Sequence, residues 1–244
     1  VRARAIRQLI LAGHQDAGTL LLEFLKNDEV ATTYRTPLIP YLTQLGSNGM
    51  RVLKDLAGSD SPAIQARALE LLAMLTSRMA EPRFFVRFLA DPSPQVRSAA
   101  LEALRRRKTT VSTVIVKQLL ANRYPEVRLQ GVELAGALQS EQTGDLLAQG
   151  LLDDDIRVRK AAIQTICGLR TERWQHYLKQ SLRDPDEEIR RTALTALLRT
   201  MDDEVRDVLA DIQGVLDDPE MKKQIQIILT RAARMNGGKR KTAK

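Results

Sequence analysis

Hydrophobic and polar positions recur along the central part of this chain with a period of 31 residues. A branched apolar residue followed directly by arginine marks each of the four central copies, and we call this position of the repeat the anchor. Four anchors lie one period apart, at Val96, Val127, Val158 and Ile189. Further apolar or small residues follow each anchor by four, five and eight positions, which is the spacing of one helix face. A long internal period of this kind indicates a repeat protein.

A second apolar series supports the same period. Leucines lie at positions 89, 120, 151 and 182, again 31 residues apart. Looser copies extend the pattern in both directions, so that eight anchors lie at residues 1, 34, 64, 96, 127, 158, 189 and 221. Each copy predicts two helices: a short first helix, as at residues 83–89 or 112–120, then a polar turn, then a second helix that starts near the anchor.

Proline and serine residues support the predicted start of the second helices. Pro62, Pro94 and Pro125 each lie two residues before an anchor. Proline suits the first turn of a helix because its missing N–H would have no partner there. Ser61 and Ser93 precede two of these prolines, and we expect them to be N-caps.

The residue four positions after the anchor is small in most copies. It is alanine or glycine at Ala5, Ala68, Ala100, Gly131, Ala162 and Ala193. A small side chain at a fixed place on a helix lets a neighbouring helix approach closely. The aromatic content of only 4% agrees with such stacking, because large rings would hold the helices apart.

The Asp-Pro turn, the Val-Arg pair and the following Ala-Leu-x-x-Leu resemble HEAT repeats in their short bacterial form, over roughly residues 1–234. The resemblance implies an all-α fold, a right-handed α-solenoid of seven to eight stacked antiparallel helix pairs, with the second helices lining a concave side. It also implies scaffolding and protein binding. We expect one repeat array over residues 1–235 and a flexible basic tail over residues 236–244.

The residue after the anchor is basic in seven of the eight copies, and we call this series the ladder. Its members are Arg2, Arg35, Arg97, Arg128, Arg159, Arg190 and Lys222. One interpretation is a binding stripe for phosphate or acidic protein. The favoured one is structural: each arginine meets a turn residue five positions before the anchor, such as Asp91, Asp153 or Asp184, and ties adjacent repeats together.

Charge is unevenly distributed within the net +8 of the chain. Residues 1–122 carry a net +7, residues 123–238 a net −3, and residues 239–244 a net +4. The run from Arg105 to Lys108 ends a second helix, where cations suit the helix dipole; it is also a candidate contact for acidic protein or phosphate. Opposite charges in the two halves permit head-to-tail self-association.

Residues of catalytic or metal-binding type form no recognisable motif. His14 and His176 lie far apart, Cys167 is alone, and no P-loop, GxGxxG or HExxH occurs. The triplet 153–155 of aspartates is interpreted as a repeat turn with acidic N-caps. Some bacterial proteins of HEAT-like fold excise alkylated DNA bases, but the aromatic residues such chemistry uses are scarce here. We therefore expect no enzyme, no cofactor and no metal.

The resulting hypothesis is a non-enzymatic module that binds a protein partner on its concave surface. Helical position selects these side chains for contact: Arg67, Glu70, Met74, Ser98, Glu102, Arg105, Arg106, Leu129, Glu133, Lys160, Gln164, Arg191, Thr195 and Arg199. The alternative is nucleic-acid binding through the basic first half and tail. The chain starts at Val1 rather than methionine, so we expect a fragment of a larger protein. It has no membrane-length apolar run. We expect a cytoplasmic location, with a membrane-associated parent chain as the alternative.

Overall fold

The structure, a computed structural model, describes Gln8 and residues 46–75, 81–138, 140–169, 174–199, 203–214 and 216–241. All regular elements within these ranges are helices, and they divide between two compact units, Val1–Leu138 and Gln139–Lys244. The anchors Val1 and Tyr34, with Arg2 and Arg35 of the ladder, lie outside the described residues.

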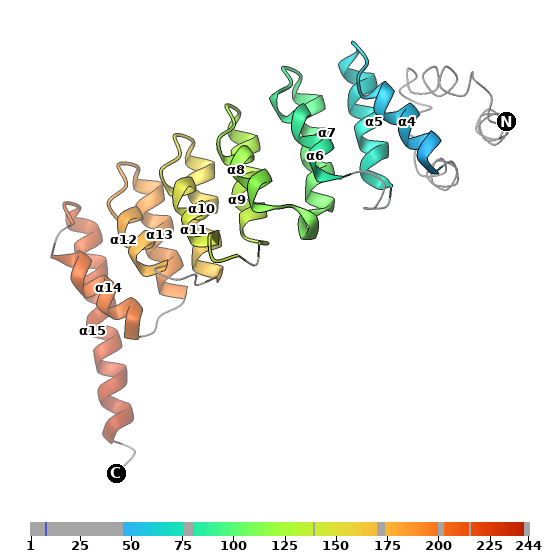
Figure 1. Ribbon diagram of the computed structural model, residues 1–244. Helices are drawn as coiled ribbons and strands as arrows, with labels where there is room; N and C mark the ends of the chain where they lie inside the picture. The colour runs from blue at the N-terminus through green and yellow to red at the C-terminus, as the bar shows by residue number, and fades with distance from the viewer. Residues whose placement is uncertain are drawn as a thin grey trace. The chain divides into compact units, whose positions relative to one another are not determined.

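Unit 1 (Val1–Leu138) contains three consecutive helix pairs among its described residues (Figure 1). The first helices, which we call A helices, are α4 (Gly46–Leu56), α6 (Pro82–Val86) continued by the 3-10 helix η1 (Arg87–Ala90), and α8 (Thr113–Leu120). The second or B helices are α5 (Pro62–Met74), α7 (Pro94–Arg106) and α9 (Pro125–Ala135), and a 3-10 turn η2 (Lys108–Thr110) precedes α8. Each A helix packs on its own B helix, and α5, α7 and α9 pack in series.

Unit 2 (Gln139–Lys244) repeats this arrangement. Its A helices are α10 (Thr143–Leu151), α12 (Trp174–Ser181) and α14 (Asp203–Gln213), and its B helices are α11 (Ile156–Leu169), α13 (Glu187–Arg199) and α15 (Pro219–Lys241). The A helices pack in series, as do α11 and α13, so each type forms its own layer (Figure 1). The predicted all-α solenoid of antiparallel helix pairs is therefore confirmed. Helix α15 extends to Lys241, so it includes most of the residues 236–244 that the sequence predicted to be a flexible tail.

The predicted register matches the helix boundaries closely. The six described B helices each begin two residues before their anchor, and every one of these anchors is buried: Ile64, Val96, Val127, Val158, Ile189 and Met221. Prolines occupy the first turn of α5, α7 and α9, as expected. Burying one Val or Leu side chain contributes roughly 1.5–3 kcal/mol, so the repeated anchors are a main source of stability.

The helix N-caps differ from the expectation for serine. Ser61 and Ser93 occupy the N-cap positions of α5 and α7, but neither hydroxyl makes a capping hydrogen bond. In unit 2, aspartates do this instead: Asp155 Oδ1 accepts from the backbone N of Arg157 at 2.9 Å, and Asp186 Oδ1 accepts from that of Glu188 at 2.8 Å. The acidic N-cap predicted within the triplet 153–155 is thus confirmed for Asp155.

The small position four residues after the anchor brings helices close together. Ala68, Ala100, Ala162 and Ala193 are fully buried. In α9 the position is Gly131, where an added Cβ would lie 3.0 Å from Leu119 Cβ and 3.1 Å from the backbone N of Leu120. Helix α9 therefore contacts α8 at a distance that leaves no room for even one methyl group.

Candidate protein-interaction surface

The turn between the A and B helices has the same backbone geometry in four consecutive repeats. A side-chain oxygen of an aspartate or asparagine accepts a hydrogen bond from the backbone N two residues later. The pairs are Asp91 with Ser93, Asn122 with Tyr124, Asp153 with Asp155, and Asp184 with Asp186, at 2.8–2.9 Å. This Asx-turn uses the polar side chain to hold its own loop, so the main-chain carbonyls of the turn need another donor.

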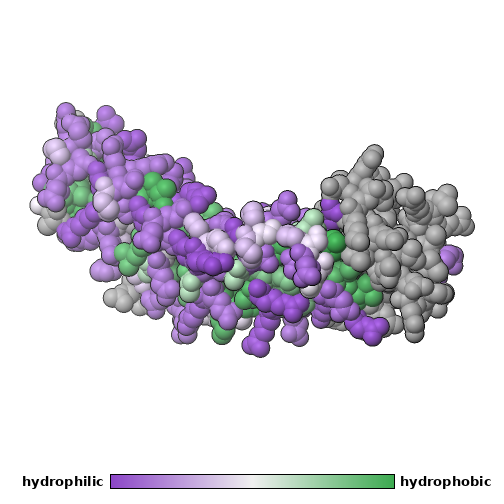
Figure 2. Space-filling view, turned by 90° about the horizontal axis from the view of Figure 1, so that it is seen from above, coloured by the Kyte–Doolittle hydropathy of each residue, from purple (hydrophilic) through white to green (hydrophobic). Residues whose placement is uncertain are grey.

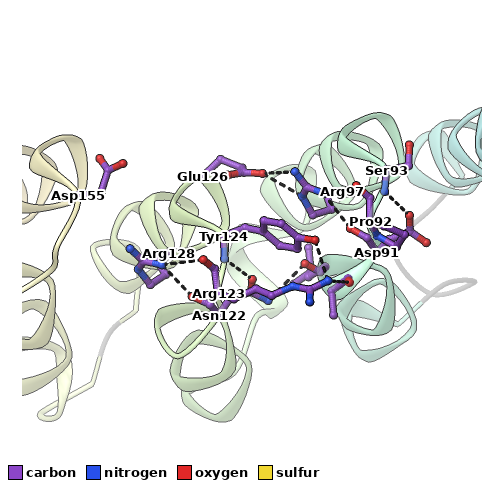
Figure 3. Close-up of polar contacts among 12 residues, drawn as sticks. Asp91, Pro92, Ser93, Arg97, Asn122, Arg123, Tyr124, Glu126, Arg128 and Asp155 are labelled. Atoms are coloured by element: carbon purple, nitrogen blue, oxygen red, sulfur yellow. Dashed lines mark hydrogen bonds and ion pairs between the residues drawn. The ribbon is translucent and has the colours of Figure 1, made fainter.

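Ladder arginines supply that donor. Arg97 Nη1 donates to the carbonyls of Asp91 and Pro92, both at 2.9 Å (Figure 3). The Nη1 atoms of Arg128, Arg159 and Arg190 make the equivalent pair of bonds in their own turns at 2.7–3.2 Å. The turn residues are those expected from the sequence, but the contact is with their carbonyl oxygens and not with their carboxylates.

Three ladder arginines also reach an acidic residue of the next repeat, in the turn before its B helix or in the first turn of that helix. Arg97 Nε and Nη2 donate to Glu126 Oε1 at 2.9 and 2.7 Å (Figure 3). Arg159 Nε lies 3.1 Å from Asp184 Oδ2, and Arg190 Nη2 lies 3.1 Å from Asp218 Oδ2. Each arginine therefore joins its own turn to the following one, and its guanidinium is occupied within the protein.

Two turn carboxylates of unit 2 titrate below the usual range. The side-chain hydrogen bond from Arg157 lowers the pKa of Asp155 from 3.8 to about 2. The backbone N–H of Met221, followed by Arg190, lowers the pKa of Asp218. Both carboxylates are ionised at neutral pH and serve as N-caps and ion-pair partners.

The basic run at the end of α7 divides into exposed and buried members. Arg105 and Arg106 are exposed and both pair with Glu102 one turn earlier. Arg107 is only 3% exposed and donates to the carbonyls of Leu72 and Leu75 at the end of α5, at 2.8 and 3.2 Å. Burial first, and then the charge of Arg106, lower the pKa of Arg107. Sequence reasoning missed this buried cap, since nothing in the run distinguishes its third residue.

The candidate contact residues of unit 1 lie on three neighbouring B helices. Ser98, Arg105, Arg106 and Glu133 are exposed, and the remaining five are half-buried: Arg67, Glu70, Met74, Glu102 and Leu129. The residue six positions after the anchor is glutamate in all three repeats, at Glu70, Glu102 and Glu133. Because α5, α7 and α9 pack in series, these glutamates lie at equivalent places on adjacent helices. The B layer of unit 1 is thus less basic than its net charge suggests.

The candidate contact residues of unit 2 lie on α11 and α13. Gln164, Arg191, Thr195 and Arg199 are exposed, and Lys160 is half-buried. Lys160 pairs with Glu188, and Arg191 pairs with Glu187. Which of these side chains contact a partner, and whether those of both units form one concave surface, stay predictions.

Exposed apolar side chains are few and scattered in the described part of the chain. Large ones occur at four separate places: Val114, Leu152, Leu169 and Ile227. On the face seen in Figure 2, hydrophilic residues predominate and hydrophobic ones lie in separate small areas. Within the described ranges, no group of histidine, cysteine and acidic residues could hold a metal ion. No helix there is long and apolar enough to cross a membrane.

The histidine and cysteine noted in the sequence have ordinary surroundings. Cys167 is 7% exposed, with its Sγ 3.1 Å from the carbonyl O of Ala196. His176 is exposed on α12. On the same helix, Trp174 and Tyr177 are buried, and the Tyr177 hydroxyl lies 3.0 Å from Asp145 Oδ1. His14 lies outside the described residues.

Comparison with solved structures shows the same fold in proteins of low sequence identity. Cex1p is 16% identical with a TM-score of 0.60, and the match covers 98% of this chain and 54% of Cex1p. The YibA protein of Escherichia coli is 22% identical with a TM-score of 0.50, over 93% of this chain and 85% of YibA. A chain of the Pds5–Scc1 complex is 13% identical with a TM-score of 0.58, over 86% of this chain and 40% of the other.

This chain therefore spans only about half the length of Cex1p, and the likenesses concern the fold alone. No curated protein matches the sequence. A family model described as HEAT repeats matches residues 50–136 and 144–229, which together make up well over half of the chain. The resemblance noted in the turns, the ladder and the small positions is thereby confirmed, and the chain belongs to the HEAT-repeat family.

Proposed function

We propose that this chain is a non-enzymatic protein-interaction module that binds its partner through the exposed faces of its B helices. One observation carries the proposal: at equivalent positions of a regular frame, the side chains differ in charge and polarity between repeats, apart from the glutamate that the repeats of unit 1 share. Two and six residues after the anchor, the exposed or half-buried residues are Ser98 and Glu102, Leu129 and Glu133, Lys160 and Gln164, and Arg191 and Thr195.

Within each unit, packing and ion pairs between repeats hold the frame that carries these side chains. The anchors are buried, and the ladder arginines Arg97, Arg159 and Arg190 join consecutive turns. Binding of a partner to such a surface costs little conformational entropy, because the helices are already folded and packed before the partner binds. Specificity then comes from the particular side chains in each repeat. One chain of similar fold was solved in a protein complex, that of Pds5 with Scc1, which is in keeping with this proposal.

The observations favour a protein partner over nucleic acid on the B layer of unit 1. Arg97 pairs with Glu126, and both Arg105 and Arg106 pair with Glu102. Phosphate binding needs several cations that can neutralise the backbone. Here, Glu126 and Glu102 already pair with these cations, and the glutamates at positions 70 and 133 add negative charge.

Site-specific photo-crosslinking in cells of the source organism tests the proposal. A benzophenone amino acid replaces Gln164 or Thr195 on the B helices, or Gln180 on α12 as a matched control, since all three are exposed polar residues of unit 2. We expect the first two variants to form a discrete adduct with another protein and the control to form none.

Two results would contradict the proposal. Adducts at Gln180 but not at Gln164 or Thr195 would assign binding to the A layer. Crosslinks to nucleic acid from the B-helix positions would favour the alternative function. An adduct with a second copy of this chain would support the predicted self-association as the relevant protein contact.

The cytoplasmic location stays part of the proposal, and fractionation of the same cells tests it.

A further inference from the structure

A cluster of cations and aromatic rings lies on the A helices of unit 1, on residues that the proposed B-helix contacts do not include. Phe84 of α6 is half-buried, and two cations lie against its ring. Lys54 Nζ of α4 is 5.3 Å from the ring centroid, and Arg87 Cζ of η1 is 4.2 Å from it. Arg87 Cζ also lies 4.6 Å from the centroid of Phe88. The two repeats of α4 and α6 thus each place one cation at the same ring.

The next repeat extends this cluster. Arg123, which follows α8, lies with its Cζ 4.6 Å from the ring centroid of Tyr124, and Arg97 Cζ lies 3.6 Å from the same centroid. Figure 3 shows the ring between the two arginines. Arg123 Nη2 also donates to the Tyr124 hydroxyl at 2.7 Å and to the carbonyl of Ala90 at 3.1 Å.

The two halves of the cluster meet at η1. Arg87 begins this 3-10 helix, and Ala90, whose carbonyl accepts from Arg123, ends it. With three residues per turn and a rise of about 2 Å per residue, the two residues lie only one turn apart. Lys54, Arg87 and Arg123 therefore belong to one surface built by three consecutive repeats. We call Lys54, Phe84, Arg87, Arg123 and Tyr124 the cationic surface.

The charges of the cationic surface have no counter-ion within the described part of the chain. Among the described residues, the charged groups of Lys54 and Arg87 lie against aromatic rings, and that of Arg123 contacts a ring, a hydroxyl and a carbonyl. The acidic residues nearest in sequence are Asp55, Asp91 and Glu126. Asp55 is exposed, Asp91 Oδ1 accepts from the backbone N of Ser93, and Glu126 pairs with Arg97, so none of them forms an ion pair with these three cations. By contrast, the B-layer cations Arg97, Arg105 and Arg106 all have carboxylate partners.

The close approach of cations without carboxylate partners favours the binding of an anion. Each ring attracts a cation through its quadrupole, but Lys54 and Arg87 at one ring repel each other. A carboxylate bound between them relieves that repulsion. The rings also restrict the side chains before any ligand binds, so less conformational entropy is lost on binding.

We propose that the cationic surface binds an acidic segment of a protein partner. Arginine and aromatic residues are enriched at protein–protein interfaces, and both occur here side by side. Single-stranded nucleic acid needs free ring faces on which bases can stack, whereas cations lie against Phe84 and Tyr124. Duplex DNA draws its affinity from many phosphate contacts, and this surface offers three uncompensated cations.

Fluorescence polarisation with two labelled probes tests the proposal on the full chain at low salt. One probe is an oligo-glutamate peptide with interspersed leucines, and the other is a mixed-sequence DNA duplex of similar net charge. The double variant Arg87→Gln/Arg123→Gln removes two charges from the cationic surface. The matched control Arg105→Gln/Arg106→Gln removes two charges that already have a partner.

We expect the first double variant to weaken binding of the peptide at least tenfold and the control to weaken it less than threefold. Circular dichroism and thermal melting establish that both variants remain folded. Equal weakening by the two variants would overturn the proposal, because net charge alone would explain it. So would tighter binding of the duplex than of the peptide, with the duplex lost in the first variant, because the surface would then be a phosphate site.

Discussion

A ladder arginine is one residue with two structural contacts, one in its own turn and one in the next repeat. The sequence predicted the turn residues that Arg97 meets, but not the atoms. Asp91 Oδ1 already accepts from the backbone N of Ser93, so the carbonyls of the turn are left for the guanidinium. Whether the arginine meets a carboxylate or a carbonyl depends on the backbone geometry of the turn, which the repeated residue types do not specify. The ion pair with Glu126 likewise joins residues that no local pattern connects.

Replacement of Arg97 tests the cost of losing both contacts. Its side chain is 9% exposed and that of Glu126 is 41% exposed. Removing one partner of a buried pair costs several kcal/mol, and the half-exposed partner reduces this, so we expect Arg97→Ala to lower the free energy of unfolding by about 2 kcal/mol in a urea titration. Arg105→Ala, which breaks an exposed pair, is expected to cost at most about 0.5 kcal/mol. Equal losses would show that the ladder contributes no more than a surface pair.

Asp155 makes a pH-dependent contribution that can be isolated. Its pKa is lowered from 3.8 to about 2, so the folded state favours the ionised form. The stabilisation is complete above the ordinary pKa and is lost as pH falls through the lowered one. Asp155→Asn keeps an N-cap but loses the charge. We expect its melting temperature to lie below that of the wild type at pH 7, and the two to converge as the pH falls below about 2.

The control for this pH dependence is Asp154→Asn. Asp154 is the exposed neighbour in the same turn, and its carboxylate takes part in no ion pair of the described residues. Its melting temperature should follow that of the wild type at every pH. A constant offset for Asp155→Asn across the whole pH range would contradict the assigned role of the charge.

At the scale of the helix, the start of each B helix was predictable and the cap was not. Proline in the first turn and a buried anchor two residues later specify where α5, α7 and α9 begin. The cap depends on which side-chain oxygen reaches a free N–H, and Ser61 and Ser93 do not reach one. Gly131, by contrast, was predicted correctly. Its place in the repeat predicted a small residue, and the structure shows that a larger one would collide with α8.

Two glycine substitutions separate helix propensity from packing. Alanine is favoured over glycine inside a helix by roughly 1 kcal/mol. At Gly168, near the end of α11, an added Cβ meets no atom within 4 Å, so Gly168→Ala is expected to stabilise the protein by about 0.5–1 kcal/mol. At Gly131, the same Cβ lies 3.1 Å from the backbone N of Leu120, and we expect a loss of about 1–3 kcal/mol. Urea titration measures both, and stabilisation by Gly131→Ala would show that α8 and α9 separate easily.

At the scale of the molecule, the periodic pattern predicted the fold, whereas net charge predicted the surfaces poorly. The first half is basic in sequence, yet the B layer of unit 1 pairs Arg97, Arg105 and Arg106 with carboxylates. The uncompensated cations described there, Lys54, Arg87 and Arg123, lie on or next to A helices. Assigning a charge to a layer requires the helix register. Assigning it a partner requires knowledge of contacts between residues of different repeats, such as Arg97 and Glu126, which lie 29 positions apart.

Because repeats contact mainly their neighbours, damage should stay local. Arg190 joins its own turn to Asp218 before α15. Arg190→Ala removes this link, and we expect hydrogen exchange to accelerate at least tenfold in peptides from α13 and α15, where local opening becomes easier. Peptides from α5 and α7 in unit 1 should keep the wild-type rate. Arg191→Ala, which breaks an exposed pair on α13, is the matched control. Acceleration of equal size in both units would mean that the chain opens as one cooperative body, and the links between turns would then stabilise the whole array together.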